Sequence, residues 1–186
     1  ITVDDEIIPF QLGLREVKIE DKKLLINGKP VKLRGINRHD NSPTGGYTVS
    51  MEDMVRDLFL LKRANVNAIR TSHYPNDPRF YDLAEALGFY IINEADIETH
   101  GLWNLDCPED LISHDLKWAP RYMDRVRRMY FRDRTHPSII MWSLGNESWG
   151  YKCHDKCYEM LKELTEIPVH YEGVCRTKRY HYDVFS

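Results

Sequence analysis

Polar and ionisable side chains occur in four clusters along the sequence, and each cluster directly follows an apolar run. The clusters occupy residues 37–40, 72–74, 94–100 and 146–148. Carboxylates, imidazoles and amides can transfer protons, bind sugar hydroxyls or hold a metal ion. Any one cluster has an ordinary structural explanation, but four in equivalent places favour a shared functional site.

Glu147 is the strongest candidate for acid–base chemistry. It follows the apolar run 139–144 and stands next to Asn146, whose amide can hydrogen-bond a sugar hydroxyl. A carboxyl group in an apolar setting can stay protonated and act as a general acid. Glycoside hydrolysis needs such an acid and a second carboxylate, about 5–5.5 Å away in retaining enzymes.

A second kind of chemistry is suggested by Glu98 and His100. Two positions apart in an extended segment, they point the same way. Together with Glu147 they offer two carboxylates and an imidazole, which suits Mg²⁺ with waters completing its shell. An alternative is a catalytic zinc held by Glu98, His100 and His39, which the absence of an HExxH pattern disfavours.

Structural explanations remain open for individual members of the clusters. His39 alone is more typical of a hydrogen-bonded structural histidine. Glu94 fits a buried carboxylate paired with Arg34 or Arg70, and Asp96 fits a turn cap.

The elements that must position these residues alternate between strands and helices. Strands are predicted at 31–37, 68–71, 89–93, 139–144, 169–173 and 182–185. Helices are predicted from Ser50, from Asp77 to Gly88, over 121–132 and over 152–164. This alternation favours a parallel sheet, either doubly wound or closed as a barrel. No nucleotide-binding glycine motif follows the first strand, so we expect an incomplete TIM (β/α)8 barrel of about five to six βα units.

The beginning of the chain has a different pattern. Residues 1–13 read as the tail of a preceding β domain or a linker, and 14–186 as a partial barrel domain. A short β hairpin is predicted before the barrel from 17–19 and 24–26. Asn27-Gly28 is a type I′ turn signal, and 31–33 is expected to return.

Composition excludes several other classes of function. The net charge is −3 and no basic stripe occurs, which disfavours a nucleic-acid partner. No apolar run approaches the roughly 20 residues of a membrane helix. The four cysteines, Cys107, Cys153, Cys157 and Cys175, are interpreted as free thiols, which favours a reducing, cytoplasmic location.

Four segments in order carry a resemblance to a known family. LRGINRHD (33–40), AIRTSHYPN (68–76), NEADIETHG (93–101) and THPSIIMWSLGNES (135–148) resemble the catalytic barrel of glycoside hydrolase family 2. ETHG together with SLGNES is similar to the β-galactosidase branch. The β-glucuronidase and β-mannosidase branches share the NE after the fourth strand but, as a rule, lack ETHG.

The resemblance implies roles for individual residues. Glu147 matches the general acid/base, and Asn146 matches a contact to the sugar 2-hydroxyl. His39 and His73 resemble residues that hold galactose hydroxyls and stabilise the transition state. The three residues inferred above to hold Mg²⁺ match the family's ligands, and Na⁺ or K⁺ is a further candidate cation for the parent protein.

The family's nucleophilic glutamate lies on a later strand than any recognised here. Glu172, in HYEG, matches a fifth-strand segment that is not the nucleophile. We therefore expect a truncated domain of a retaining enzyme that cleaves terminal β-D-galactosides such as lactose. The domain alone is expected to be inactive and to self-associate through its open side, and the parent to be an oligomer. The alternatives are a non-catalytic metal- or carbohydrate-binding scaffold, and a β-glucuronidase or β-mannosidase of the same family.

Overall fold

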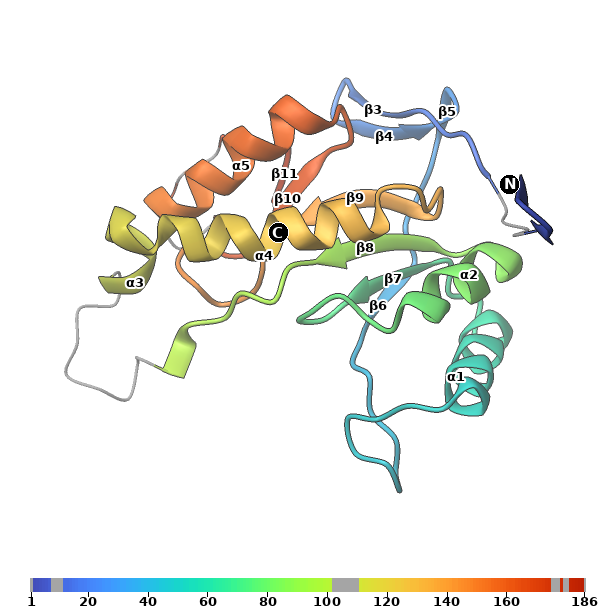
Figure 1. Ribbon diagram of the computed structural model, residues 1–186. Helices are drawn as coiled ribbons and strands as arrows, with labels where there is room; N and C mark the ends of the chain where they lie inside the picture. Colours follow the sequence, from blue (N-terminus) through green and yellow to red (C-terminus); the bar gives the residue numbers. More distant parts are fainter. Residues whose placement is uncertain (1, 8–11, 102–110, 175–177, 179–180, 186) are drawn as a thin grey trace.

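A six-stranded parallel sheet is the centre of the fold (Figure 1). The computed structural model describes residues 2–7, 12–101, 111–174, 178 and 181–185. Each strand of the sheet pairs with the next one along the chain, without a reversal of order. The strands are β6 (Gly35–Arg38), β7 (Ala68–Thr71), β8 (Tyr90–Glu94), β9 (Ile139–Ser143), β10 (Val169–Tyr171) and β11 (Val184–Phe185).

Helices connect the strands and pack on one face of the sheet. Their buried residues form one apolar cluster with Ile69, Ile91, Ile139 and Val169 of the strands. The connecting helices are α1 (Met51–Arg63), α2 (Pro78–Leu87), α4 (Ala119–Asp133) and α5 (Lys152–Leu164). Between β8 and α4 lie the short α3 (Leu111–His114) and the 3₁₀ helix η2 (Leu116–Trp118). Among the described helices, none combines the length and the apolar character that spanning a membrane requires.

Local signals set the beginnings and ends of the helices as the sequence predicts. The Ser50 hydroxyl accepts the Asp53 backbone N–H, and the Asp53 carboxylate accepts the Ser50 backbone N–H, which is a capping box. Asp77 caps α2 in front of Pro78, and Gly88 ends that helix in the left-handed region.

A three-stranded antiparallel unit packs on the other face of the sheet. It consists of β3 (Val17–Glu20), β4 (Lys23–Ile26) and β5 (Lys29–Pro30), with Asn27 and Gly28 both at positive φ in the predicted turn. Val17 and Ile26 pack on Ile140 and Met141 of β9. Helices on one face and a hairpin on the other, with sequential strand order, distinguish a barrel from a doubly wound sheet.

Two predicted boundaries near the hairpin are wrong. The returning strand is β5 at Lys29–Pro30 rather than 31–33, and the first barrel strand begins at Gly35 rather than at residue 31. Val31 still donates its N–H to the Leu24 carbonyl, and Val31 and Leu33 then pack against the hairpin cluster as an irregular connection. Their apolar character reflects this packing and not a longer strand.

The first residues of the chain form two short paired strands. These are β1 (Thr2–Val3) and β2 (Glu6–Ile7), which pair antiparallel. Their assignment to a preceding domain stays a prediction. Cys153 and Cys157 are free, as expected, and both are buried, whereas Cys107 and Cys175 lie outside the described residues.

Candidate active site

The four polar clusters lie at the carboxyl ends of neighbouring strands. Parallel strands bring these ends to one edge of the sheet, which is where barrel enzymes place their sites. The loops after β8 and β9 are joined directly, because the Asn146 backbone N–H donates to the Ile97 carbonyl at 2.9 Å. These two loops are therefore connected to each other at this edge of the sheet.

Glu147 lies in a turn with an unusual backbone after β9. Its φ is 35°, and Trp149 two residues later has a φ of 68°. Such values are uncommon for residues other than glycine and persist only where surrounding contacts hold them. Gly145 precedes the turn at φ 117°, and a Cβ there would lie 2.5 Å from the Ile97 carbonyl oxygen. The chain thus needs glycine at 145 to bring the two loops together.

The three predicted metal ligands do converge. One donor atom each of Glu98, His100 and Glu147 lies within 4.8 Å of the others. The His100 Nδ1 atom is 3.1 Å from Glu98 Oε1 and 3.4 Å from Glu147 Oε2. The side chains are 46%, 31% and 33% exposed for His100, Glu98 and Glu147, so water can reach them.

This donor set fits the cation that the sequence predicts. Two carboxylate oxygens and one imidazole nitrogen, with room for water, match the preference of Mg²⁺. His39 is not in this group; its ring lies 5.2 Å from that of His73 instead. The geometry therefore gives no support to the zinc alternative, which required His39.

Asn146 lies at the centre of the polar surface. Its amide nitrogen donates to Glu98 Oε1 at 2.7 Å, and its amide oxygen accepts from Arg70 Nη2 at 3.0 Å. The residue is 7% exposed. Its contact with a sugar hydroxyl stays a prediction, and the structure adds a role in orienting Glu98.

Glu94 is a buried carboxylate paired with an arginine, and the partner is Arg70 rather than Arg34. Arg70 donates to both carboxylate oxygens, at 2.5 and 2.9 Å, and Ser143 Oγ donates at 2.6 Å. His73 Nδ1 lies 2.7 Å from Glu94 Oε1. Burial raises the pKa of Glu94, but the hydrogen bond with His73 and the charge of Arg70 outweigh it, so the pKa is lowered overall.

The His39 and His73 rings contact each other beside the ion pair of Glu94 and Arg70. Their rings meet edge to face at 5.2 Å, and the Tyr74 ring lies 5.9 Å from that of His39. His39 is exposed, whereas His73 is half-buried and fixed by Glu94. The structure brings the two together as predicted neighbours; their contact with galactose stays a prediction.

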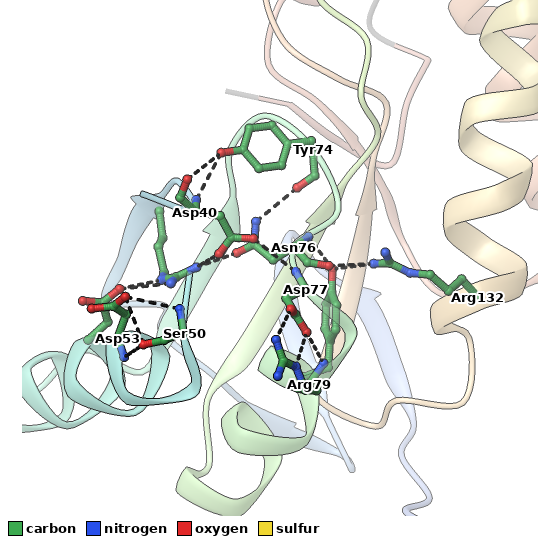
Figure 2. A network of polar contacts seen from close by, with 11 residues as sticks. Asp40, Ser50, Asp53, Tyr74, Asn76, Asp77, Arg79 and Arg132 are labelled. Carbon is green, nitrogen blue, oxygen red and sulfur yellow. Dashed lines mark hydrogen bonds and ion pairs between the residues drawn. The ribbon is translucent and has the colours of Figure 1, made fainter. Parts of the chain in front are cut away.

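A polar network supports the loops after β6 and β7 (Figure 2). Buried Arg38 donates to Asp40 at 2.6 Å and to Asn76 at 2.9 Å. Arg132, from helix α4, donates to the Asn76 carbonyl at 3.0 Å. Its side chain extends toward this network in Figure 2. The Asp77 backbone N–H donates to Asp40. These contacts stabilise the two loops that carry His39 and His73.

Sequence reasoning gave no site role to Tyr171 and Glu172, which the structure places against the Glu147 turn. The Tyr171 hydroxyl accepts the Ser148 backbone N–H at 3.0 Å, and Glu172 Oε1 accepts the Glu147 backbone N–H at 2.7 Å. Both follow the pattern of polar residues at a strand end that identified the other clusters. The preceding residue, His170, contacts Ser143 Oγ at 3.0 Å, and burial lowers its pKa to about 4.

Comparison with known families and sequences agrees with the fold. The TIM barrel domain of the glycosyl hydrolases family 2 matches residues 17–185, and the chain belongs to this family. The beta-galactosidases of Photobacterium profundum and Pectobacterium atrosepticum are each 47% identical to it over 165 residues. That alignment covers 88% of this chain and 16% of each relative, so the chain spans about a sixth of their length.

Solved structures with the same fold include β-glucuronidases. A beta-D-glucuronidase of Dictyoglomus thermophilum matches with a TM-score of 0.77 and 30% identity, over 94% of this chain and 32% of its own. The apo β-glucuronidase of Ruminococcus gnavus matches with a TM-score of 0.71 and 30% identity, over 87% of this chain and 28% of its own. The barrel is therefore common to relatives that differ in substrate.

Proposed function

We propose that these residues belong to the catalytic barrel of a retaining β-galactosidase in which Glu147 is the general acid/base. The observation that carries the proposal is the position of Glu147. Its carboxylate stands on a constrained turn at a barrel strand end, next to Glu98 and His100. Identity of 47% to two beta-galactosidases, against 30% to the structures of β-glucuronidases, favours galactosides as substrates.

The roles of the other residues follow from their places around Glu147. In the first step Glu147 donates its proton to the glycosidic oxygen while that bond breaks, and in the second it removes a proton from water. His39, His73 and Asn146 bind the hydroxyls of the sugar. Glu94 orients His73 and is not free to attack, because it is fully buried and held by Arg70. Glu94 is therefore not the nucleophile of the proposed reaction.

A bound Mg²⁺ would be held by Glu98, His100 and Glu147 and would supply positive charge beside the acid/base group. Asn146 keeps Glu98 oriented toward this group through its 2.7 Å hydrogen bond. His100 separates the two carboxylates, with its Nδ1 near both. These contacts reduce the movement needed to bind the ion.

We expect Glu98→Gln to weaken Mg²⁺ binding by the full-length protein at least about 10-fold, because one charged ligand is lost. The measurement is calorimetric titration of chelator-treated protein with MgCl₂, together with the Mg²⁺ concentration that restores half of the activity. Glu163→Gln, an exposed position on α5, is the matched control. Unchanged Mg²⁺ affinity in Glu98→Gln would remove Glu98 from the ligand set.

Substrate class is tested by parallel assays of the full-length protein with 4-nitrophenyl β-galactoside, β-glucuronide and β-mannoside. We expect kcat/KM to be highest for the galactoside, by at least about 100-fold, since polar pocket contacts discriminate strongly between sugars. A higher kcat/KM for the glucuronide would contradict the proposal and indicate a β-glucuronidase. Absence of turnover with all three would favour a non-catalytic scaffold.

A further inference from the structure

The backbone of Glu147 is hydrogen-bonded by a residue at the end of the next strand, β10. Glu172 follows strand β10 directly, and its Oε1 accepts the Glu147 N–H at 2.7 Å. The Glu147 carboxylate lies near His100 in the loop after β8, with its Oε2 atom 3.4 Å from His100 Nδ1. Glu147 is therefore contacted on two sides. His100 lies next to its carboxylate, and Glu172 accepts its backbone N–H.

The next residue in the turn is held in a similar way. Ser148 donates its backbone N–H to the Tyr171 hydroxyl at 3.0 Å and accepts at its carbonyl from Ser113 Oγ at 2.5 Å. Tyr171 is fully buried, and a Cβ at Gly150 would lie 2.5 Å from its ring. The Tyr171 ring thus has no room to shift, and the hydroxyl is a fixed acceptor.

These contacts stabilise a turn whose backbone conformation is unfavourable for its residues. Glu147 has a φ of 35°, which costs energy for a residue with a Cβ. A carboxylate is the strongest hydrogen-bond acceptor a side chain can offer to a peptide N–H. By accepting the Glu147 N–H, Glu172 stabilises the backbone in this positive-φ conformation.

We propose that Glu172 is a positioning residue for the acid/base function of Glu147, acting through the 2.7 Å hydrogen bond to its backbone N–H. The inference rests on the proposed function of Glu147. It goes beyond that function because it assigns a role to a residue that acts through the backbone of Glu147. Proton transfer depends steeply on placement, and a shift of about 1 Å costs on the order of 10²-fold in rate.

The experiment compares Glu172→Ala and Glu172→Gln in the full-length protein with two galactosides. For methyl β-galactoside, whose leaving group needs a proton, we expect kcat/KM to fall about 10–100-fold in Glu172→Ala. For 2,4-dinitrophenyl β-galactoside, which leaves without protonation, we expect a loss below about 5-fold. Glu172→Gln keeps an oxygen that accepts the N–H, so it should restore most of the lost rate.

Each arm can overturn the inference. Equal losses on both galactosides in Glu172→Ala would indicate a general structural role, and a Gln variant as poor as the Ala variant would point to charge. If Glu172→Ala does not fold, Glu172→Asp, which shortens the side chain by one methylene, must give the same dependence on leaving group. Glu147→Gln in the same assay tests the proposed function by itself: if it has no such dependence, that function fails, whatever Glu172 does.

Discussion

Replacement of Glu147 by Gln in the full-length protein should lower kcat/KM for methyl β-galactoside by about 10²–10⁴-fold, the usual contribution of a general acid. Gln keeps the shape of the side chain and lacks the transferable proton. The loss should be much smaller for 2,4-dinitrophenyl β-galactoside, because its leaving group departs without protonation. The measurement is kcat/KM for both substrates under the same conditions.

Two further observations separate this role from damage to the fold. Sodium azide should partly restore turnover of the activated substrate, because a small anion attacks the glycosyl intermediate without a general base. Glu163→Gln, on the exposed face of α5, should leave both rates within about 2-fold of the unchanged protein. Equal losses for the two galactosides in Glu147→Gln would show that Glu147 is not the proton donor.

Glu94→Gln should lower the free energy of unfolding by about 3–5 kcal/mol, because it leaves the Arg70 guanidinium without its charged partner. Glu94 is fully buried and Arg70 is 14% exposed at its side chain, so water cannot replace the lost carboxylate. The measurement is urea unfolding of the full-length protein, followed by tryptophan fluorescence. Asp124→Asn is the matched control, since its pair with Arg128 is exposed at both ends and exposed pairs contribute little. A loss no larger than that of the control would mean that the pair is not a stabilising one.

The same pair has a pH dependence with a definite sign. Burial raises the pKa of Glu94, but the hydrogen bond with His73 and the charge of Arg70 outweigh it and lower the pKa in the folded protein. A carboxyl group with a lowered folded pKa stabilises the fold above its unfolded pKa of about 4.3. That stability is lost as the pH falls through the folded value. As the pH falls below about 4.3, unfolding should therefore become easier in the unchanged protein, and less so in Glu94→Gln.

Periodic and local signals in the sequence predicted most of the fold. Strand β7, helix α5 and the caps at Ser50 and Asp77 depend on residues close in sequence, and they lie where expected. The start of β6 was predicted too early. Apolar residues that cover the hairpin have the same pattern as a strand.

Some features of the candidate site could be predicted from the sequence, and others could not. The convergence of Glu98, His100 and Glu147 could be predicted, because all three follow strands that are adjacent in a barrel. The partner of Glu94 could not be chosen between two arginines, since the choice depends on which face of its strand each occupies. The bond from Glu172 to the Glu147 backbone could not be predicted either, because it depends on an unusual φ value that no residue pattern encodes.

The sequential order of the strands also bears on how the site comes into being during synthesis. Arg70 and Glu94 are 24 residues apart, and Glu147 and Glu172 are 25 apart, so each contact joins units that leave the ribosome one after the other. Non-local pairings slow folding because long loops must close first, and these contacts avoid that delay. Domains form as the chain emerges. The contact between Glu172 and Glu147 can therefore form as soon as β10 docks on β9.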